Sequence, residues 1–425
     1  MFRLSTLIYG FFAVVFLSTS SLAGHHEEAD NGIGSTPSIS VSGILPSTSK
    51  TEYPEAQWQI KNPLNLGVSE EKVKRLFDLS FADSATQGVV LIKDGFLIGE
   101  RYAEGFEKSS YGTSWSMAKS FYASLIGISI DRGEINSLDD KVADYLDYFG
   151  DQRAEISLRD LLDMTSGLEM PDHEHENMFF SGDHLAYARD VGVEKPAGQK
   201  FEYNNVNSML LAEIIEKATG QKADALLKER VFDKIGLTDV TLWQDSAGNP
   251  LTYCCVDTTA RQYSRFGLLF ARSGNWNGEQ IISEDYVNQT FSKVWDGLES
   301  STIEQDRGYS LHWWISRHDE EAVIFNASGK FGQYVFVDRE NDIVFTRITK
   351  YYPTGGSVQD WGLLKYINWI GSVDFRLKAA AWLDSMGVIE MNNSIKTPIT
   401  YESGTSKEFF ENYNKIIDAL VDVSK

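Results

Sequence analysis

Cysteine is nearly absent from this chain of 425 residues: it has two, Cys254 and Cys255, and they are adjacent. Adjacent cysteines cannot join distant parts of a fold, so the chain is not a small secreted scaffold held together by disulfides. A vicinal disulfide stays open, but we expect two free thiols buried in a core strand, because free cysteine is among the most buried residue types. With 42% hydrophobic residues, the chain can bury a large core instead.

Basic residues are also few in comparison with acidic ones. Lys and Arg number 39 and Asp and Glu number 61, which gives a formal net charge of −22. A surface of this sign is repelled by nucleic acid and by anionic membranes, so we expect no nucleic-acid partner. We interpret the charge as a contribution to solubility that carries no information about a substrate.

Long apolar runs are missing beyond the N-terminus. Arg3 precedes an almost wholly apolar stretch from Leu7 to Leu17, and small residues flank Leu22 in Ser21-Leu22-Ala23. This order predicts a signal peptide over residues 1–23, hence an exported protein, periplasmic or secreted, with no membrane span after cleavage. An uncleaved anchor is the alternative, and it is disfavoured because a span needs about 20 apolar residues.

The remaining sequence predicts one sheet built from both ends of the chain, with helices between. Residues 24–60 are rich in Ser, Gly, Pro and acid and indicate a flexible or surface-draped arm. Residues 61–375 form the main domain, with a helical insert at about 134–250, and residues 376–425 a helical C-terminal extension. The predicted class is α+β, an α/β sandwich in which helices flank a mostly antiparallel sheet.

Individual elements follow from local patterns. Asp94-Gly95 between two apolar runs predicts a hairpin. The mostly apolar stretch from Ser116 to Arg132 predicts a buried helix that Gly133 ends. Other predicted elements are a helix capped by Ser69, helices at 158–164, 209–219, 366–369 and 375–386, and strands at 322–327, 334–338 and 343–348.

No G-x-S-x-G sequence occurs, which argues against an α/β-hydrolase. The chain does contain Ser116-Met117-Ala118-Lys119. On a helix these ends lie on one face, so the Lys119 amine can take the Ser116 proton if burial lowers its pKa. The pattern alone is weak, since two other segments match it: Ser47-x-x-Lys50 and Ser69-x-x-Lys72. Only Ser116 opens an apolar helix, and a buried lysine needs a reason.

A second candidate element is Tyr203-Asn204-Asn205, since a tyrosine hydroxyl can move a proton between nucleophile and leaving group and an asparagine can hold substrate and lysine. The same spacing recurs at Tyr286/Asn288 and Tyr366/Asn368, so a buried core tyrosine is the plainer interpretation of any one match. The run Asp172 to Glu176 has metal-binding residue types in an acidic loop, but its alternating spacing favours a solvated loop. We expect neither a metal nor a cofactor.

These motifs occur together with the stretches ISLRDLLDMTSGL, PAGQKFEYNNVNSMLLAEIIEKATG and TTARQYSRFGLLFARSGNWNGEQIIS, and with GYSLHWW. The set, spread over about residues 60–372, resembles the β-lactamase-related serine hydrolases, the superfamily of class C β-lactamases, DD-peptidases and penicillin-binding proteins. The esterase-like branch with 6-aminohexanoate-dimer hydrolase is the nearest in character. The resemblance implies that Ser116 is acylated, that Lys119 is its base, and that Tyr203 and Asn205 assist.

The third motif of that family, Lys-Thr-Gly or His-x-Gly on a strand beside the site, aligns with Ala327-Ser328-Gly329. The cation that helps to hold a substrate carboxylate is therefore missing, unless the side chain of Lys330 replaces it. By resemblance, the backbone N–H groups of Lys330 and Ser116 form an oxyanion hole, and the region with Phe179 and Phe180 lines the mouth of the cleft. Trp313 and Trp314 are expected in the core.

The sequence thus predicts a serine hydrolase that cleaves a neutral, small-molecule ester or amide. Two alternatives stay open: a β-lactamase or DD-peptidase acting on β-lactams or peptidoglycan, and a non-catalytic sensor that keeps the fold. Oligomeric state is not predicted.

Overall fold

The computed structural model divides the chain into two units, Met1–Pro37 and Ser38–Lys425, and every described residue belongs to the second. The described residues are 39–40, 51–171, 175–179, 181–238, 240–291, 293–294, 308–350, 382, 386 and 406–425. The predicted signal peptide lies outside them, as does nearly all of the predicted helices at 366–369 and 375–386. Within the described part, no helix is long and apolar enough to cross a membrane.

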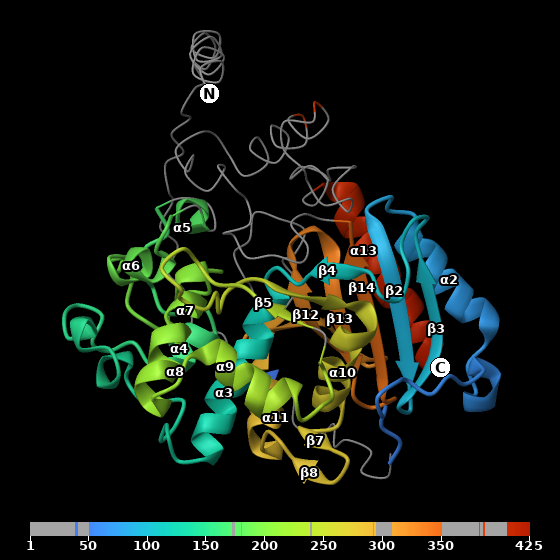
Figure 1. Cartoon of the computed structure of the whole chain (residues 1–425), viewed down its shortest axis with the longest axis horizontal. Coiled ribbons are helices and arrows are strands. Elements are labelled where there is room, and N and C mark those ends of the chain that lie inside the picture. The colour runs from blue at the N-terminus through green and yellow to red at the C-terminus, as the bar shows by residue number, and fades with distance from the viewer. Residues whose placement is uncertain are drawn as a thin grey trace, which may run out of the picture. The chain divides into compact units, whose positions relative to one another are not determined.

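Strands from both ends of the chain form one antiparallel sheet of seven strands (Figure 1). In spatial order they are β10 (Gly308–Ser310), β11 (Trp313–His318), β12 (Val323–Gly329), β13 (Gln333–Asp338), β14 (Ile343–Thr349), β2 (Thr86–Lys93) and β3 (Phe96–Tyr102). The β14–β2 pair joins the two halves of the sequence, with Val344 opposite Ile92. Asp94 and Gly95 turn between β2 and β3 with φ of 52° and 82°, as a hairpin of the predicted kind requires.

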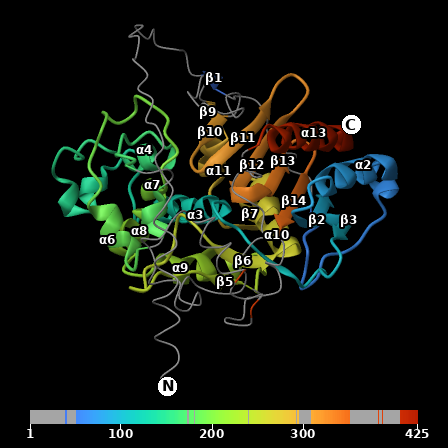
Figure 2. The same cartoon turned by 90° about the horizontal axis from the view of Figure 1, so that it is seen from above.

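Helices cover both faces of this sheet, and each face has its own hydrophobic core. On one face α2 (Glu70–Phe81) packs beside α13 (Lys407–Ser424), as Figure 2 shows. On the other face lie α3 (Met117–Asp131) and α10 (Ala260–Ala271). Every residue from Met117 to Ser129 is buried, which confirms the prediction of a helix enclosed in the middle of the protein.

Between β3 and β10 the chain is mostly helical. This part contains α4 (Leu158–Leu162), α5 (Glu176–Phe179), α6 (His184–Arg189), α7 (Asn205–Met209), α8 (Leu211–Thr219), α9 (Ala223–Leu227), the 3-10 turns Val142–Asp144 and Asp147–Phe149, and a π-helical turn over Lys228–Phe232. The remaining elements include α11 (Glu284–Thr290) and three small sheets. These are β7 (Asn275–Trp276) with β8 (Glu279–Gln280), β1 (Ile39–Ser40) with β9 (Lys293–Val294), and β4 (Tyr111–Thr113) with β6 (Val256–Thr259) and β5 (Thr241–Leu242).

Two expectations about local structure need correction. The structure pairs Cys254 with Cys255 in a vicinal disulfide just before β6, where we expected free thiols; both residues are buried, as predicted. Of the run Asp172 to Glu176, expected in a solvated loop, residues 172–174 lie outside the described part and Glu176 begins α5. His175 is fully buried, with its Nδ1 3.2 Å from the Tyr187 hydroxyl. The alternating polar sequence gave no sign of this contact, which forms when the segment packs against α6, twelve residues further along the chain.

Candidate active site

Ser116 lies in the tight turn between β4 and α3. The preceding residue, Trp115, has φ of 46°, a left-handed conformation that is costly for a bulky side chain and that clusters at functional sites. Backbone bonds hold the turn: Ser114 N–H donates to Val256 O at 2.8 Å, and Cys255 N–H donates to Trp115 O at 3.5 Å. The turn leaves Ser116 partly exposed at the N-terminus of a buried helix, where helix N–H groups favour negative charge.

Lys119 lies one turn further along α3 and points back to Ser116. Its side chain is 1% exposed, its Nζ is 2.9 Å from Ser116 Oγ, and its Nζ donates to the Tyr253 carbonyl oxygen at 2.8 Å. The Tyr253 carbonyl therefore fixes the amine against the serine hydroxyl. A neutral amine in this place would accept the hydroxyl proton across the same 2.9 Å.

The ring of Tyr203 lies close to the same amine. Lys119 Nζ is 4.9 Å from the centroid of the Tyr203 ring. The segment is fixed by Asn204, which caps α7: its Oδ1 accepts from Val206 N–H at 2.9 Å, and its Nδ2 donates to Leu168 O at 3.2 Å. The structure thus brings together three of the predicted residues from two distant parts of the sequence.

Asn205 follows directly as the first residue of α7, and it is buried. Because Asn204 caps this helix, the same hydrogen bonds that fix Asn204 also fix the backbone of its neighbours Tyr203 and Asn205. The motif is thus a short extended stretch that leads into a helix, held by Asn204.

The end of β12 reaches the same turn. A Cβ added at Gly329 would lie 2.1 Å from the carbonyl oxygen of Ser114, so only glycine allows this approach. Ala327 is fully buried and faces the core that contains α3, while Ser328 pairs with Tyr334 and is partly exposed. The position expected for a cation therefore holds a buried methyl group.

Lys330 begins the turn between β12 and β13. Its side chain is partly exposed, and its Nζ lies 5.9 Å from the centroid of the Phe331 ring. Its backbone follows directly on Gly329, the last residue of β12.

Aromatic side chains surround the turn that carries Ser116. The Trp115 ring lies 5.8 Å from that of Phe179 and 5.9 Å from that of Phe331, and all three are nearly buried. Phe179 therefore packs against the residue that precedes Ser116; Phe180 lies outside the described residues. These rings make the surroundings of Ser116 apolar on this side.

Several residues at the site were missed by sequence reasoning. Tyr253 contributes a carbonyl oxygen, for which no side-chain pattern exists. Trp313 is in the core as expected, but Trp314 is partly exposed and stacks on Tyr203 with 5.5 Å between centroids. Neighbouring strand residues face opposite sides of a sheet, so only one of two adjacent tryptophans faces the core. The sequence of two tryptophans does not show which one it is.

The described residues contain no group of three or more His, Cys, Asp or Glu that could hold a metal ion. Of the acidic loop considered for this role, residues 172–174 lie outside the described part. His175 points to Tyr187.

Comparison with known proteins places the chain in a family. The Beta-lactamase family profile matches residues 90–365. The chain is 22% identical over 306 residues to the 6-aminohexanoate-dimer hydrolase of Paenarthrobacter ureafaciens, covering 65% of this chain and 76% of that protein. It is 31% identical over 176 residues to a D-aminopeptidase of Brucella anthropi, covering 37% of this chain and 33% of that protein.

Solved structures share the fold. A putative 6-aminohexanoate-dimer hydrolase from Bacillus anthracis superposes with a TM-score of 0.62 at 20% identity, covering 91% of this chain and 90% of that one. A penicillin-binding protein homologue from Caulobacter crescentus superposes with a TM-score of 0.55 at 15% identity, covering 67% and 92%.

Proposed function

Because the chain belongs to the Beta-lactamase family and is a serine hydrolase, we propose that Ser116 is its nucleophile, Lys119 its general base and Tyr203 a proton carrier to the leaving group. The observation that carries the proposal is the buried amine of Lys119, 2.9 Å from Ser116 Oγ. A lysine is retained inside a protein core when its charge or its proton is used.

The reaction proceeds in two halves. The neutral Lys119 amine takes the proton of Ser116 while Oγ attacks the substrate carbonyl carbon and forms a C–O bond. The tetrahedral adduct collapses, the bond to the leaving group breaks, and a proton passes from Lys119 through the Tyr203 hydroxyl to that group. Water then attacks the acyl-enzyme by the same proton path, and the acid leaves while Ser116 regains its proton.

The backbone N–H groups of Ser116 and Lys330 are the proposed donors to the oxyanion. The contact between Gly329 and the Ser114 carbonyl supports this pairing, because it brings the end of β12 to the residue that stands two before the nucleophile. Two preorganised N–H donors stabilise the charge that develops on the carbonyl oxygen. Asn205 is assigned to hold the substrate beside Lys119.

The proposed substrate is a small, neutral ester or amide. Ala327 and Ser328 offer no positive charge where a substrate carboxylate would lie, and the rings of Trp115, Phe179 and Phe331 favour an apolar group beside Ser116. β-Lactams and peptidoglycan stems carry such a carboxylate, which weakens both as substrates. Lys330 is the alternative source of charge, and its removal tests this point.

The experiment is a substrate panel on the purified chain lacking residues 1–23, with p-nitrophenyl esters, an anilide and nitrocefin. We expect ester turnover at least 10²-fold above that of nitrocefin, and its loss in Ser116→Ala. Ser124→Ala is the matched control, because Ser124 is buried on the same helix and its Oγ donates to Phe121 O. Rapid nitrocefin turnover that Lys330→Ala abolishes would support a β-lactamase instead, and a stable acyl-enzyme without turnover would support a sensor.

We also propose that the chain is exported and cleaved after Ala23. The apolar run from Leu7 to Leu17 and the small residues Ser21 and Ala23 support this. N-terminal sequencing of protein expressed in a Gram-negative host with its leader should begin at Gly24. An intact N-terminus in the membrane fraction would support an anchor.

A further inference from the structure

A buried polar chain lies behind the proposed proton carrier and takes no part in the mechanism above. The imidazole of His312 joins two hydroxyl groups: its Nε2 is 2.9 Å from Ser208 Oγ, and its Nδ1 is 3.2 Å from the Tyr309 hydroxyl. All three residues are at most 2% exposed. Burial lowers the pKa of His312 well below its usual value, so the ring stays neutral and offers one donor and one acceptor to its two partners.

The backbone of His312 is fixed as firmly as its side chain. It has φ of 64°, its N–H donates to Leu162 O at 2.9 Å, and its carbonyl oxygen accepts from Ser120 Oγ at 2.6 Å. Ser120 directly follows Lys119 on α3, and Ser208 belongs to α7, which begins two residues after Tyr203. His312 therefore joins the helix of the proposed base to the helix that follows the proposed proton carrier.

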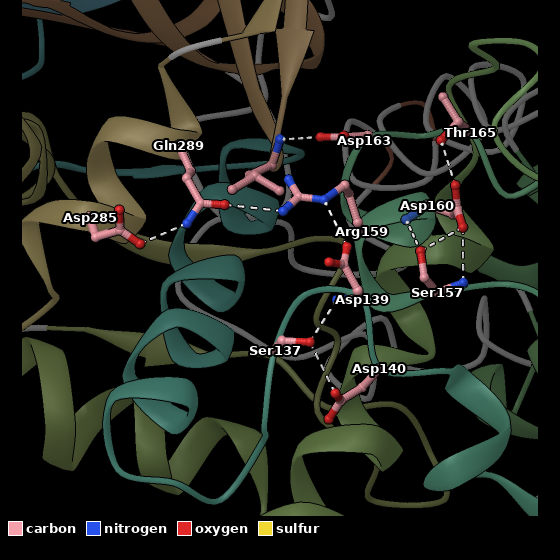
Figure 3. A network of polar contacts seen from close by, with 11 residues as sticks. Ser137, Asp139, Asp140, Ser157, Arg159, Asp160, Asp163, Thr165, Asp285 and Gln289 are labelled. Carbon is pink, nitrogen blue, oxygen red and sulfur yellow. Dashed lines mark hydrogen bonds and ion pairs between the residues drawn. The ribbon is translucent and has the colours of Figure 1, made fainter.

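The neighbouring residue Leu311 anchors this connection to the helical insert. Its N–H donates to Asp163 Oδ1 at 2.9 Å, at the end of α4. Figure 3 shows Asp163 beside a polar network in which Arg159 reaches both Asp139 and Gln289. The turn between β10 and β11 is thus held from the insert and from α3 together.

Tyr309 connects His312 to Tyr203, because its hydroxyl contacts the imidazole and its ring contacts the Tyr203 ring. Its ring meets the Tyr203 ring edge-on, with 6.0 Å between centroids and 90° between planes, and meets Trp314 edge-on at 4.8 Å. Trp314 in turn stacks on Tyr203 at 5.5 Å. Edge-on and stacked rings prefer defined separations and angles, so two neighbours of this kind restrict where the Tyr203 ring can lie.

We propose that His312, acting through Tyr309, is a positioning residue that holds the Tyr203 hydroxyl in line between Lys119 and the leaving group. The proposal rests on the proposed function, in which Tyr203 delivers the proton. The proposal predicts an effect that a loss of stability does not produce. The rate lost on removing the positioning residue must be larger for esters whose leaving group needs a proton in order to depart. A p-nitrophenolate leaves without a proton, whereas an unsubstituted phenolate leaves more readily when it receives one.

The experiment compares p-nitrophenyl acetate with phenyl acetate in Tyr309→Phe, which removes one hydroxyl and keeps the ring. We expect kcat/KM for phenyl acetate, which reports the acylation step in which the phenolate leaves, to fall on the order of 10-fold, and kcat/KM for p-nitrophenyl acetate to fall less than about 3-fold. His312→Asn, which tolerates a positive φ, should change the ratio in the same direction. Tyr286→Phe is the matched control: it also removes a buried tyrosine hydroxyl bonded to α3, at Ala123 O, and should leave the ratio as in the wild type.

Each outcome separates this inference from the proposed function. A folded Tyr309→Phe variant with the wild-type ratio of the two rates overturns the positioning role while Ser116 chemistry stands. The same change of ratio in Tyr286→Phe also overturns it, because a general loosening of α3 would then account for the effect. Ester turnover that survives Ser116→Ala removes the proposed function itself.

Discussion

Gly329→Ala is the substitution whose effect follows most directly from the geometry. The new methyl carbon would lie 2.1 Å from the carbonyl oxygen of Ser114, and real Cβ atoms keep at least 3.0 Å from such a neighbour. The end of β12 and the turn before Ser116 must therefore separate by about 0.9 Å, since the obstacle is backbone and cannot rotate away. Gly329 itself has φ of −125° and ψ of 158°, which any residue adopts, so the effect is purely steric.

This separation moves one proposed oxyanion donor away from the other. A misplacement of about 1 Å in an active site costs roughly 10²-fold in rate, equivalent to about 2.7 kcal/mol of transition-state stabilisation. Overpacking lowers the free energy of unfolding by about 1–3 kcal/mol as well. We therefore expect a folded enzyme whose kcat for p-nitrophenyl acetate is lower by about two orders of magnitude.

The assay measures kcat by ester turnover and the free energy of unfolding by urea titration on the same preparation. Gly88→Ala is the control, because its Cβ would meet the Tyr102 ring at 2.7 Å on β2, which is separated from β12 by β13 and β14. It should lose a comparable amount of stability and keep its kcat. Wild-type kcat in a folded Gly329→Ala variant would refute the reasoning.

Three further predictions concern stability. Arg272→Met should lower the free energy of unfolding by about 3–5 kcal/mol in urea titration, because Asp342, 2.8 Å from the guanidinium and also buried, loses its partner. Recovery of stability in a second variant that also replaces Asp342 with Asn, which removes the charge and tolerates the φ of 50° at this position, would identify the unpaired carboxylate as the cause; a loss below about 1 kcal/mol would contradict the prediction. Burial lowers the pKa of His184 to about 4, so between pH 6.5 and 4 the unfolded chain binds a proton at this residue and the folded chain does not. The neutral, buried His184 therefore contributes on the order of 3 kcal/mol to the free energy of unfolding above pH 6.5, and this contribution is lost as the pH falls toward 4. His184→Asn should flatten that part of the curve of stability against pH. Ile416→Ala in α13 should cost about 2–5 kcal/mol, since Ile416 is fully buried against the sheet; a change in melting temperature near zero would mean that α13 does not close this core.

The elements that sequence reasoning predicted well are those with a local cause. The hairpin at Asp94-Gly95 depends on turn chemistry, and α3 depends on a run of apolar residues that no surface helix carries. The strands near 322–327, 334–338 and 343–348 appear as β12, β13 and β14 with small shifts at their ends. Each of these signals lies within about 15 residues of sequence, so no knowledge of distant contacts is needed.

The parts that could not be predicted depend on contacts between distant residues. Tyr253 acts through a backbone carbonyl, which every residue has, and only the fold places that carbonyl 2.8 Å from Lys119 Nζ. The three strands β4, β5 and β6 are too short to leave a periodic pattern. His312 lies in the segment GYSLHWW, whose resemblance to the family gives this histidine no particular role. Its contacts with Ser208 and Tyr309 form only when the sheet and the helical insert pack together.

The central claim is that Ser116 becomes acylated with Lys119 as its base, and trapping the adduct tests it most directly. The chain lacking residues 1–23 would be treated with a fluorophosphonate, digested and analysed by mass spectrometry. We predict one modified residue, Ser116, with labelling abolished in Ser116→Ala and slowed on the order of 10²-fold or more in Lys119→Met, which keeps the side-chain volume and removes the amine. A modified peptide that does not contain Ser116, or undiminished labelling of Ser116→Ala, would contradict the account.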